Sequence, residues 1–169
     1  MYHKSLVLSI QLKLQKSATF QREGDNLMTR KLYSLALAKY DSARIYNPRD
    51  SAIFVKKIND CKSKMNDEKI FSLLMDSLAI IIATGEELYK NSRYLETVDE
   101  YSKAIEILNE AKNLRFDNAR VGKWRNKLGS MVLALQIKMD YLIEKFKDMG
   151  DTTLMNKYQI KKAMLLVNF

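Results

Sequence analysis

The chain has 169 residues, a formal net charge of +9, 47% hydrophobic residues and 29% charged residues. This length and composition predict one soluble, folded domain with a core of its own. The sequence has five glycines and one proline, which favours long helices, and its single cysteine excludes an internal disulfide and a four-thiolate zinc site.

The positive charge is unevenly distributed along the chain. Residues 1–66 contain thirteen Lys and Arg against five Asp and Glu, residues 67–116 contain six against ten, and residues 117–169 contain ten against five. Two basic thirds therefore flank an acidic middle. A partner attracted by charge would be acidic, and the attraction would weaken as salt is added.

Residues 1–16 allow two interpretations. Five apolar residues alternate as in a strand: Leu6, Leu8, Ile10, Leu12 and Leu14. Leu6, Ile10 and Leu14 also share one face of a helix. We favour the helix, because every other segment of the chain has helical periodicity and an isolated strand would have no pairing partner.

The same segment contains the only histidine and a weak targeting signal. His3 would lie in a mobile terminus, which makes it a poor general base or metal ligand. The apolar run is short and interrupted by a lysine, and no stretch approaches the roughly 18 apolar residues of a membrane span. The sequence therefore favours a cytoplasmic protein.

The next segment contains the first half of an internal repeat. Residues 24–48, GDNLMTRKLYSLALAKYDSARIYNP, have apolar residues at three- and four-residue steps, and Asn47-Pro48 ends this helical pattern. Residues 85–109, GEELYKNSRYLETVDEYSKAIEILN, match them at an offset of 61 residues. The matched pairs are Gly24 and Gly85, Leu27 and Leu88, Tyr33 and Tyr94, Tyr40 and Tyr101, and Ala43 and Ala104.

These residue types suit two antiparallel helices in close contact. Glycine and alanine allow the helix backbones to approach, and the tyrosines fill the space between them. Each large apolar side chain buried there contributes on the order of 1.5–3 kcal/mol. One such helix pair cannot cover its own apolar face, so neighbouring pairs must stack.

This pattern resembles the tetratricopeptide repeat, a 34-residue helix-turn-helix. The match is strong over residues 17–50, where the seven signature positions are Phe20, Gly24, Leu27, Ala36, Tyr40, Ala43 and Pro48. It is moderate over residues 78–111, where the first aromatic, the first alanine and the proline are replaced by Ile81, Thr97 and Asn109. A degenerate third unit is expected near the C-terminal end.

The resemblance implies an all-α protein, an α-solenoid or right-handed superhelix of about seven antiparallel helices in a single domain over residues 1–169. Repeat 1 covers residues 17–50 and repeat 2 covers about 68–113. Between them, residues 51–65 form an amphipathic helix that a turn at Asn66-Asp67 ends.

A long helix and a final helix are expected over residues 117–168. Asp117-Asn118 would cap the long helix and Met149-Gly150-Asp151 would form the turn after it. The predicted apolar stripe of the long helix consists of Val121, Trp124, Leu128, Val132, Leu135, Met139, Leu142 and Phe146.

Signals of catalysis are close to absent. The sequence has no nucleotide-binding, hydrolase or metalloprotease motif. Cys61 lies on an apolar stripe with Phe54 and Ile58, which favours a buried thiol over a nucleophile. Adjacent carboxylates such as Asp99-Glu100 are typical of solvated helix faces. We therefore expect no enzyme activity, no metal and no cofactor.

The resemblance implies that a partner protein or peptide binds along the concave face lined by the first helix of each repeat. The corresponding residues are Gln21, Asp25, Met28, Thr29, Ile82, Glu86, Tyr89 and Lys90. One subclass clamps the C-terminal carboxylate of chaperones with Lys and Asn, whereas this chain has Gln21 with Asp25 and Ile82 with Glu86. The acids would repel such a carboxylate, so the sequence argues against that subclass.

The expected function is a non-enzymatic protein-interaction scaffold, and two alternatives stay open. Nucleic acid or another polyanion could bind basic residues of the end helices: Lys56, Lys57, Arg120, Lys123, Arg125 and Lys127. Trp124 within the latter group is more typical of a buried residue than of a stacking platform. Self-association into a homo-oligomer or a larger assembly would use the apolar tail at residues 164–167.

Overall fold

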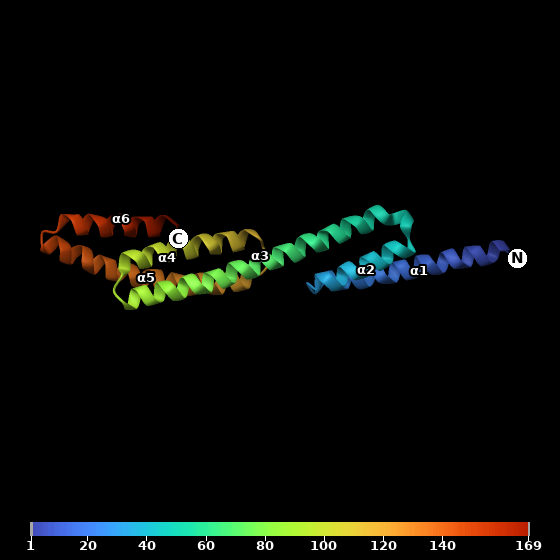
Figure 1. Cartoon of the computed structure of the whole chain (residues 1–169), viewed down its shortest axis with the longest axis horizontal. Helices are drawn as coiled ribbons and strands as arrows, with labels where there is room; N and C mark the ends of the chain where they lie inside the picture. Colours follow the sequence, from blue (N-terminus) through green and yellow to red (C-terminus); the bar gives the residue numbers. More distant parts are fainter. Residues whose placement is uncertain (1, 169) are drawn as a thin grey trace. The chain divides into compact units, whose positions relative to one another are not determined.

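The computed structural model describes the backbone of residues 2–168 and the side chains of residues 6–167. Within this range the chain forms six α-helices, one short 3-10 helix and no strand (Figure 1). This result confirms the all-α class. The predicted number of about seven helices is too high by one, because two of the expected helices are continuous. The His3 side chain lies outside the described residues.

Contacts within the chain group into two compact units, Met1–Lys69 and Ile70–Phe169, called unit 1 and unit 2 below. The sequence predicts a single domain of successive repeats. The structure places the boundary between the two units inside one long helix, α3 (Ser51–Lys90).

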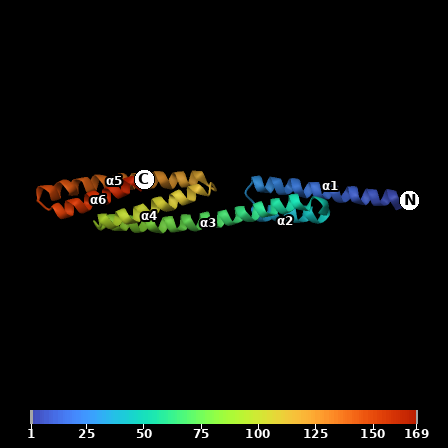
Figure 2. The same ribbon diagram turned by 90° about the horizontal axis from the view of Figure 1, so that it is seen from above.

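Unit 1 is a helical hairpin closed by a third helix. α1 (Tyr2–Thr29) and α2 (Tyr33–Tyr46) lie antiparallel, and the N-terminal turns of α1 extend beyond the end of α2 (Figure 2). The short helix η1 (Pro48–Asp50) leads into α3, whose first turns pack on the hairpin. The central buried residues are Ala36, Tyr40, Ile58 and Cys61.

α1 begins at Tyr2, so the helical interpretation of residues 1–16 is confirmed and the strand alternative is wrong. The alternating leucines do not form a strand because no second strand exists among the described residues to pair with it.

The turn predicted at Asn66-Asp67 is wrong, because α3 runs without a break through these residues for 40 residues in all. Asn and Asp can end a helix, but in a helix interior they cost less than about 0.7 kcal/mol each relative to alanine. No glycine or proline lies nearby to break the helix, and the apolar residues on both sides of Asn66-Asp67 pack into cores.

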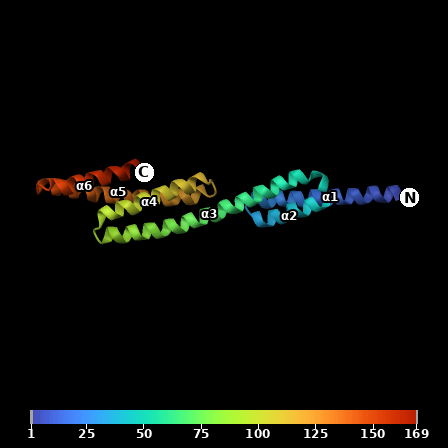
Figure 3. The ribbon, with the colours of Figure 1, turned by 45° about the horizontal axis from the view of Figure 1, so that its top comes forward.

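Unit 2 comprises the rest of α3 with α4 (Tyr94–Asn113), α5 (Asn118–Asp148) and α6 (Thr152–Asn168). α5 and α6 lie side by side (Figure 3). Sixteen buried residues form its core: Phe71, Met75, Leu78, Ile82, Val98, Tyr101, Ala104, Ile105, Leu108, Ala111, Val121, Leu128, Val132, Leu135, Met139 and Leu165.

The predicted helix ends are largely confirmed. α2 ends at Tyr46, directly before Asn47-Pro48, and the Asp117 side chain caps α5 by accepting a hydrogen bond from the Arg120 N–H. Residues 121, 128, 132, 135 and 139 of the predicted α5 stripe are buried, and the other three are half-buried. Ile143, which the stripe did not include, is also buried.

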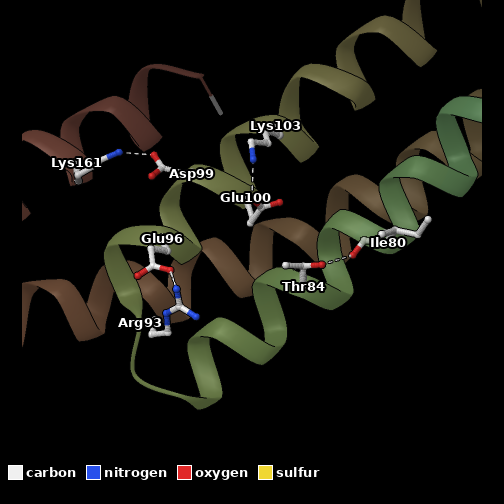
Figure 4. A network of polar contacts seen from close by, with 8 residues as sticks. All are labelled: Ile80, Thr84, Arg93, Glu96, Asp99, Glu100, Lys103 and Lys161. Atoms are coloured by element: carbon white, nitrogen blue, oxygen red, sulfur yellow. Dashed lines mark hydrogen bonds and ion pairs between the residues drawn. The ribbon is translucent and has the colours of Figure 1, made fainter.

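Exposed ion pairs connect the helices of unit 2 on its surface. Lys161 of α6 pairs with Asp99 of α4, while Glu100 pairs with Lys103 on its own helix (Figure 4). Lys162 of α6 likewise pairs with Asp140 of α5. Such pairs contribute at most about 1 kcal/mol each. The Asp99 side chain is 49% exposed and that of Glu100 only 18%, so the expected solvated face holds for Asp99 and only in part for Glu100.

Candidate functional site

The two sequence copies form equivalent helix crossings. Gly24 of α1 lies against the Tyr40 ring, and a Cβ atom at this glycine would be 2.6 Å from Cε1 of Tyr40. Gly85 of α3 lies against Tyr101 in the same way, with its Cβ position 2.8 Å from Cδ1. Both tyrosines are 2% exposed. The crossings therefore require glycine on one helix and a flat ring on the other.

The turn of the α1–α2 hairpin and the turn of the second hairpin, which the end of α3 forms with α4, have the same geometry. The Lys31 N–H bonds the Met28 carbonyl and the Leu32 N–H bonds the Leu27 carbonyl. Sixty-one positions later, the Ser92 N–H bonds the Tyr89 carbonyl and the Arg93 N–H bonds the Leu88 carbonyl. Lys31 and Ser92 both adopt positive φ, at 59° and 61°. This is the hydrogen-bond pattern that ends many helices with a left-handed residue.

A third turn of this kind joins α5 to α6. The Gly150 N–H bonds the Lys147 carbonyl, the Asp151 N–H bonds the Phe146 carbonyl, and Gly150 has φ of 74°. The predicted turn at 149–151 is therefore confirmed. In this third turn glycine occupies the left-handed position, which non-glycine residues adopt less readily.

Each hairpin is also contacted by the helix that follows it. Lys57 of α3 donates to Asp25 of α1 at 2.5 Å, and Lys127 of α5 pairs with Glu86 of α3 at 3.0 Å. Asp25 and Glu86 occupy equivalent positions of the 61-residue repeat. The acid of each first helix is thus neutralised by a lysine of the third helix.

The helix that follows each hairpin, α3 in unit 1 and α5 in unit 2, contains a short pattern that was not predicted. Phe54, Lys57, Ile58 and Cys61 on α3 correspond to Trp124, Lys127, Leu128 and Met131 on α5, at a constant offset of 70 residues. Ile58 and Leu128 are buried in their respective cores. The signal escaped detection because the offset is 70 here and 61 in the hairpins: α4 is longer than α2, and the pattern begins further into α5 than into α3.

A small apolar cavity opens beside the ion pair of unit 2. Its volume is about 150 Å³. It is lined by residues of α3, α4 and α5: Glu86, Tyr89, Lys90, Tyr101, Met131 and Ala134. Small-molecule sites usually measure about 300–1,000 Å³. The cavity is therefore suited to a single apolar side chain, with charged groups of both signs at its edge.

In unit 1 the residues at the equivalent positions contact one another. The Cys61 Sγ lies 3.3 Å from the Met28 Sδ, and the Lys57 ammonium lies 5.1 Å from the centre of the Tyr40 ring. Cys61 is fully buried, and burial raises the pKa of its thiol. The buried-thiol interpretation of Cys61 is confirmed.

The polar groups around the two tyrosines differ as well. The Tyr40 hydroxyl donates to Asp25 at 2.6 Å. Partial burial by itself would raise the pKa of Asp25, but hydrogen bonds from Lys57 and Tyr40 outweigh it and hold this pKa below its usual value. At Tyr101, burial first and then the negative charge of Glu86 raise the phenol pKa to about 12. Tyr101 therefore stays neutral over the physiological range.

The predicted groove residues do not form one surface, because some line the cavity of unit 2, some belong to unit 1 and one is buried in a core. Glu86, Tyr89 and Lys90 line the cavity. Asp25 and Met28 contact other residues of unit 1. On the same helix, Gln21 is half-buried and Thr29 is exposed.

Ile82 is only 1% exposed. Its side chain belongs to the core and is inaccessible to a partner. Met131 and Ala134 complete the cavity, but they were not predicted because they come from α5, outside the repeat.

The residues predicted to bind polyanions do not form one cluster. Lys56 and Lys57 belong to unit 1, whereas the other four belong to unit 2. Lys57 and Lys127 are engaged in ion pairs, and Arg125 donates to the Asn109 side chain at 2.5 Å. Trp124 is half-buried against the core, with Lys127 over its ring.

A separate basic hollow of about 270 Å³ lies where α4 meets α5, lined by Lys112, Arg115, Asn118, Gly122 and Arg125. In the predicted self-association tail, Leu165 is fully buried whereas Met164, Leu166 and Val167 are exposed.

Comparisons of the chain with protein-family models, with curated proteins and with solved structures found no match. None of the helices in the described range is long and apolar enough to cross a membrane. Among the described side chains, no three His, Cys, Asp or Glu residues are grouped so that they could hold a metal ion.

Proposed function

We propose that the protein is a non-enzymatic interaction scaffold related to tetratricopeptide-repeat proteins, and that it binds a partner through the cavity between α3, α4 and α5. The observation that supports this proposal is the cavity itself. It has an apolar lining of Tyr89, Tyr101, Met131 and Ala134, and an acid and a base at its edge. Protein interfaces typically concentrate their binding energy in such small desolvated pockets.

The composition of the cavity indicates what the partner inserts. An apolar side chain the size of leucine or methionine would fill the space, while the partner backbone would lie close to Glu86 and Lys90. The pairing of Glu86 with Lys127 removes the net negative charge from one side. With this charge neutralised, the apolar lining makes an apolar anchor the favoured ligand.

The proposal is tested by filling the cavity. Ala134→Trp places a large ring in the cavity from an exposed position of α5, and Leu133→Trp adds the same ring to a neighbouring exposed position that does not line it. We expect tagged wild-type protein and Leu133→Trp to capture the same discrete partner from lysate at moderate salt. Ala134→Trp should lose it. Equal capture by both variants would exclude the cavity as the binding site.

A second function, binding of a polyanion, is supported by the basic hollow at the α4–α5 turn. Lys112, Arg115 and Arg125 converge there without an acidic residue in the lining. Binding of a phosphate-bearing polymer at this place should weaken steeply with salt. The double variant Arg115→Ala with Lys112→Ala should abolish it and leave capture by the cavity unchanged.

A further inference from the structure

The first turns of α1 expose an unusual amount of apolar surface. Six large apolar side chains between residues 6 and 14 are each 43–62% exposed: Leu6, Val7, Leu8, Ile10, Leu12 and Leu14. They follow one another within nine residues, whereas single exposed apolar residues are normal on a protein surface. These turns extend beyond the end of α2 (Figures 1 and 2).

Four of these residues continue a face of α1 that is already an interface. In the later part of α1, the Ser17 hydroxyl donates to the Ala43 carbonyl of α2, Gly24 lies against Tyr40, and Met28 contacts Cys61 of α3. The positions Met28, Gly24, Gln21 and Ser17 follow one another at alternating steps of four and three residues. The same spacing continued toward the N-terminus gives Leu14, Ile10 and Val7. Together with the adjacent Leu6, these three residues are called the α1 stripe.

The covering helix stops before this stripe. Ser17 is 2% exposed, whereas Leu14, one helical turn away, is 44% exposed. α2 ends at Tyr46, and the Lys16 ammonium lies 5.4 Å from the centre of the Tyr46 ring at that point. A helix laid along the stripe would continue the packing that α2 provides over residues 17–28.

The charges around the stripe indicate the chemistry of the occupant. Residues 1–22 contain three lysines and one arginine but no Asp or Glu. Lys13 and Lys16 lie within the exposed turns. A partner helix with acidic residues beside its apolar face would gain attraction there, because opposite charges across an interface favour association.

The same charges argue against a second copy of this segment as the occupant. Two copies would bring like charges together across the contact.

We propose that the α1 stripe docks an amphipathic helix of a partner protein whose apolar face is flanked by Asp and Glu. This second docking surface is independent of the cavity in unit 2. The stripe provides the apolar contacts, and Lys13 and Lys16 select for acidic flanks.

The test uses the full chain and a synthetic fluorescein-labelled helical peptide with leucines at heptad spacing and glutamates beside them. A matched peptide has lysines in place of the glutamates. The double variant Ile10→Gln with Leu14→Gln changes the stripe, and Leu8→Gln with Leu12→Gln makes the same change on another side of the helix. All four side chains are at least 43% exposed, and none belongs to the buried cluster of unit 1.

Fluorescence anisotropy should give a Kd for the acidic peptide that is at least about tenfold weaker in the stripe variant, because two apolar contacts are lost. The control variant and Ala134→Trp should bind within about threefold of wild type. The lysine peptide should bind at least about tenfold more weakly than the acidic one.

Three results would overturn the proposal. The first is equal weakening in the stripe and control variants, and the second is equal binding of the two peptides. The third is no peptide binding at all; the chain is then tested for co-sedimentation with phosphatidylserine vesicles and for concentration-dependent dimerisation. The vesicle result would identify a lipid surface, and dimerisation would identify a second copy.

Discussion

The two units solve the same packing problem with cores of different size. In both, a glycine of the first helix meets a buried tyrosine of the second, a left-handed residue makes the turn, and a lysine of the third helix neutralises an acid of the first. The central cluster of unit 1 has four buried residues, whereas that of unit 2 has sixteen. Cys61 and Met28 contact each other next to the Lys57–Asp25 pair of unit 1, whereas an open cavity lies beside the Lys127–Glu86 pair of unit 2.

Two helix crossings of the same geometry therefore have different surroundings. Cys61 contacts Met28 in unit 1, whereas the longer Met131 and the larger Tyr89 line a cavity in unit 2. Larger side chains need not pack more tightly, because shape and rotamer decide how well a gap is filled. The following predictions test how far the two units are alike.

The largest effect is expected at the glycines of the crossings. Gly24→Ala and Gly85→Ala should each lower the free energy of unfolding by about 1–3 kcal/mol, because the added methyl group meets a buried ring. Gly122→Ala on α5 is the matched control, since nothing lies within 4 Å of its Cβ position. There, alanine should increase stability by about 0.5–1 kcal/mol. Urea unfolding followed by circular dichroism measures all three.

Destabilisation by Gly85→Ala but not by Gly24→Ala would show that the crossing of unit 1 adjusts where that of unit 2 does not. Stabilisation by both would contradict the close approach of the helices.

The difference in core size should appear in hydrogen exchange. We expect the amides of α2 to exchange at least about tenfold faster than those of α4, because fewer buried contacts hold α2 in place. Mass spectrometry of peptic fragments measures both helices in one sample. Equal protection would mean that the two cores unfold as one cooperative unit despite their different sizes.

The turns offer a smaller and more local effect. Ser92→Gly should increase stability by about 1 kcal/mol, because glycine adopts the positive φ of 61° without steric cost. Gly150→Ala should lower stability by a similar amount, since that turn has φ of 74°. Thermal unfolding of the two variants should shift in opposite directions, and shifts of the same sign would refute the equivalence of the turns.

The smallest effect concerns the acid of unit 1. The pKa of Asp25 is lowered in the folded chain, so its stabilising contribution is present above the usual value of 3.8 and is lost as the pH falls through the folded-state value. Asp25→Asn should cost less than about 1 kcal/mol at neutral pH, because the side chain is nearly half exposed, and a smaller amount near pH 2.

Urea titrations at the two pH values compare wild type with Asp25→Asn, and Asp76→Asn, an exposed carboxyl on α3, serves as the control. A cost that stays equally large at low pH would mean that the asparagine disturbs packing rather than charge.

The parts of the fold that depend on local chemistry could be predicted from the sequence. The glycine–tyrosine pairs, the helix end at Asn47-Pro48 and the Asp117 cap each follow from one residue type in one local setting. Continuity of α3 could not be predicted, because Asn66-Asp67 is compatible with a cap or with a helix interior and only distant packing decides between them.

The candidate site was only half predictable for the same reason. Tyr89, Glu86 and Lys90 follow from the repeat, whereas Met131 and Ala134 are brought to the cavity by the length of α4, which changes the offset between corresponding residues. Ile82 occupies a position that the repeat assigns to the partner-binding face, but packing of α3 buries its side chain in the core of unit 2.

The continuity of α3 has a practical consequence for dissecting the chain. Its first turns supply Lys57, Ile58 and Cys61 to the core of unit 1, while its last turns supply Gly85 and Glu86 to unit 2. One helix thus completes one core and begins the next. The smallest fragment that retains the whole first core therefore ends near Lys69. A boundary at Pro48, where the repeat ends in sequence, would remove the helix that completes this core.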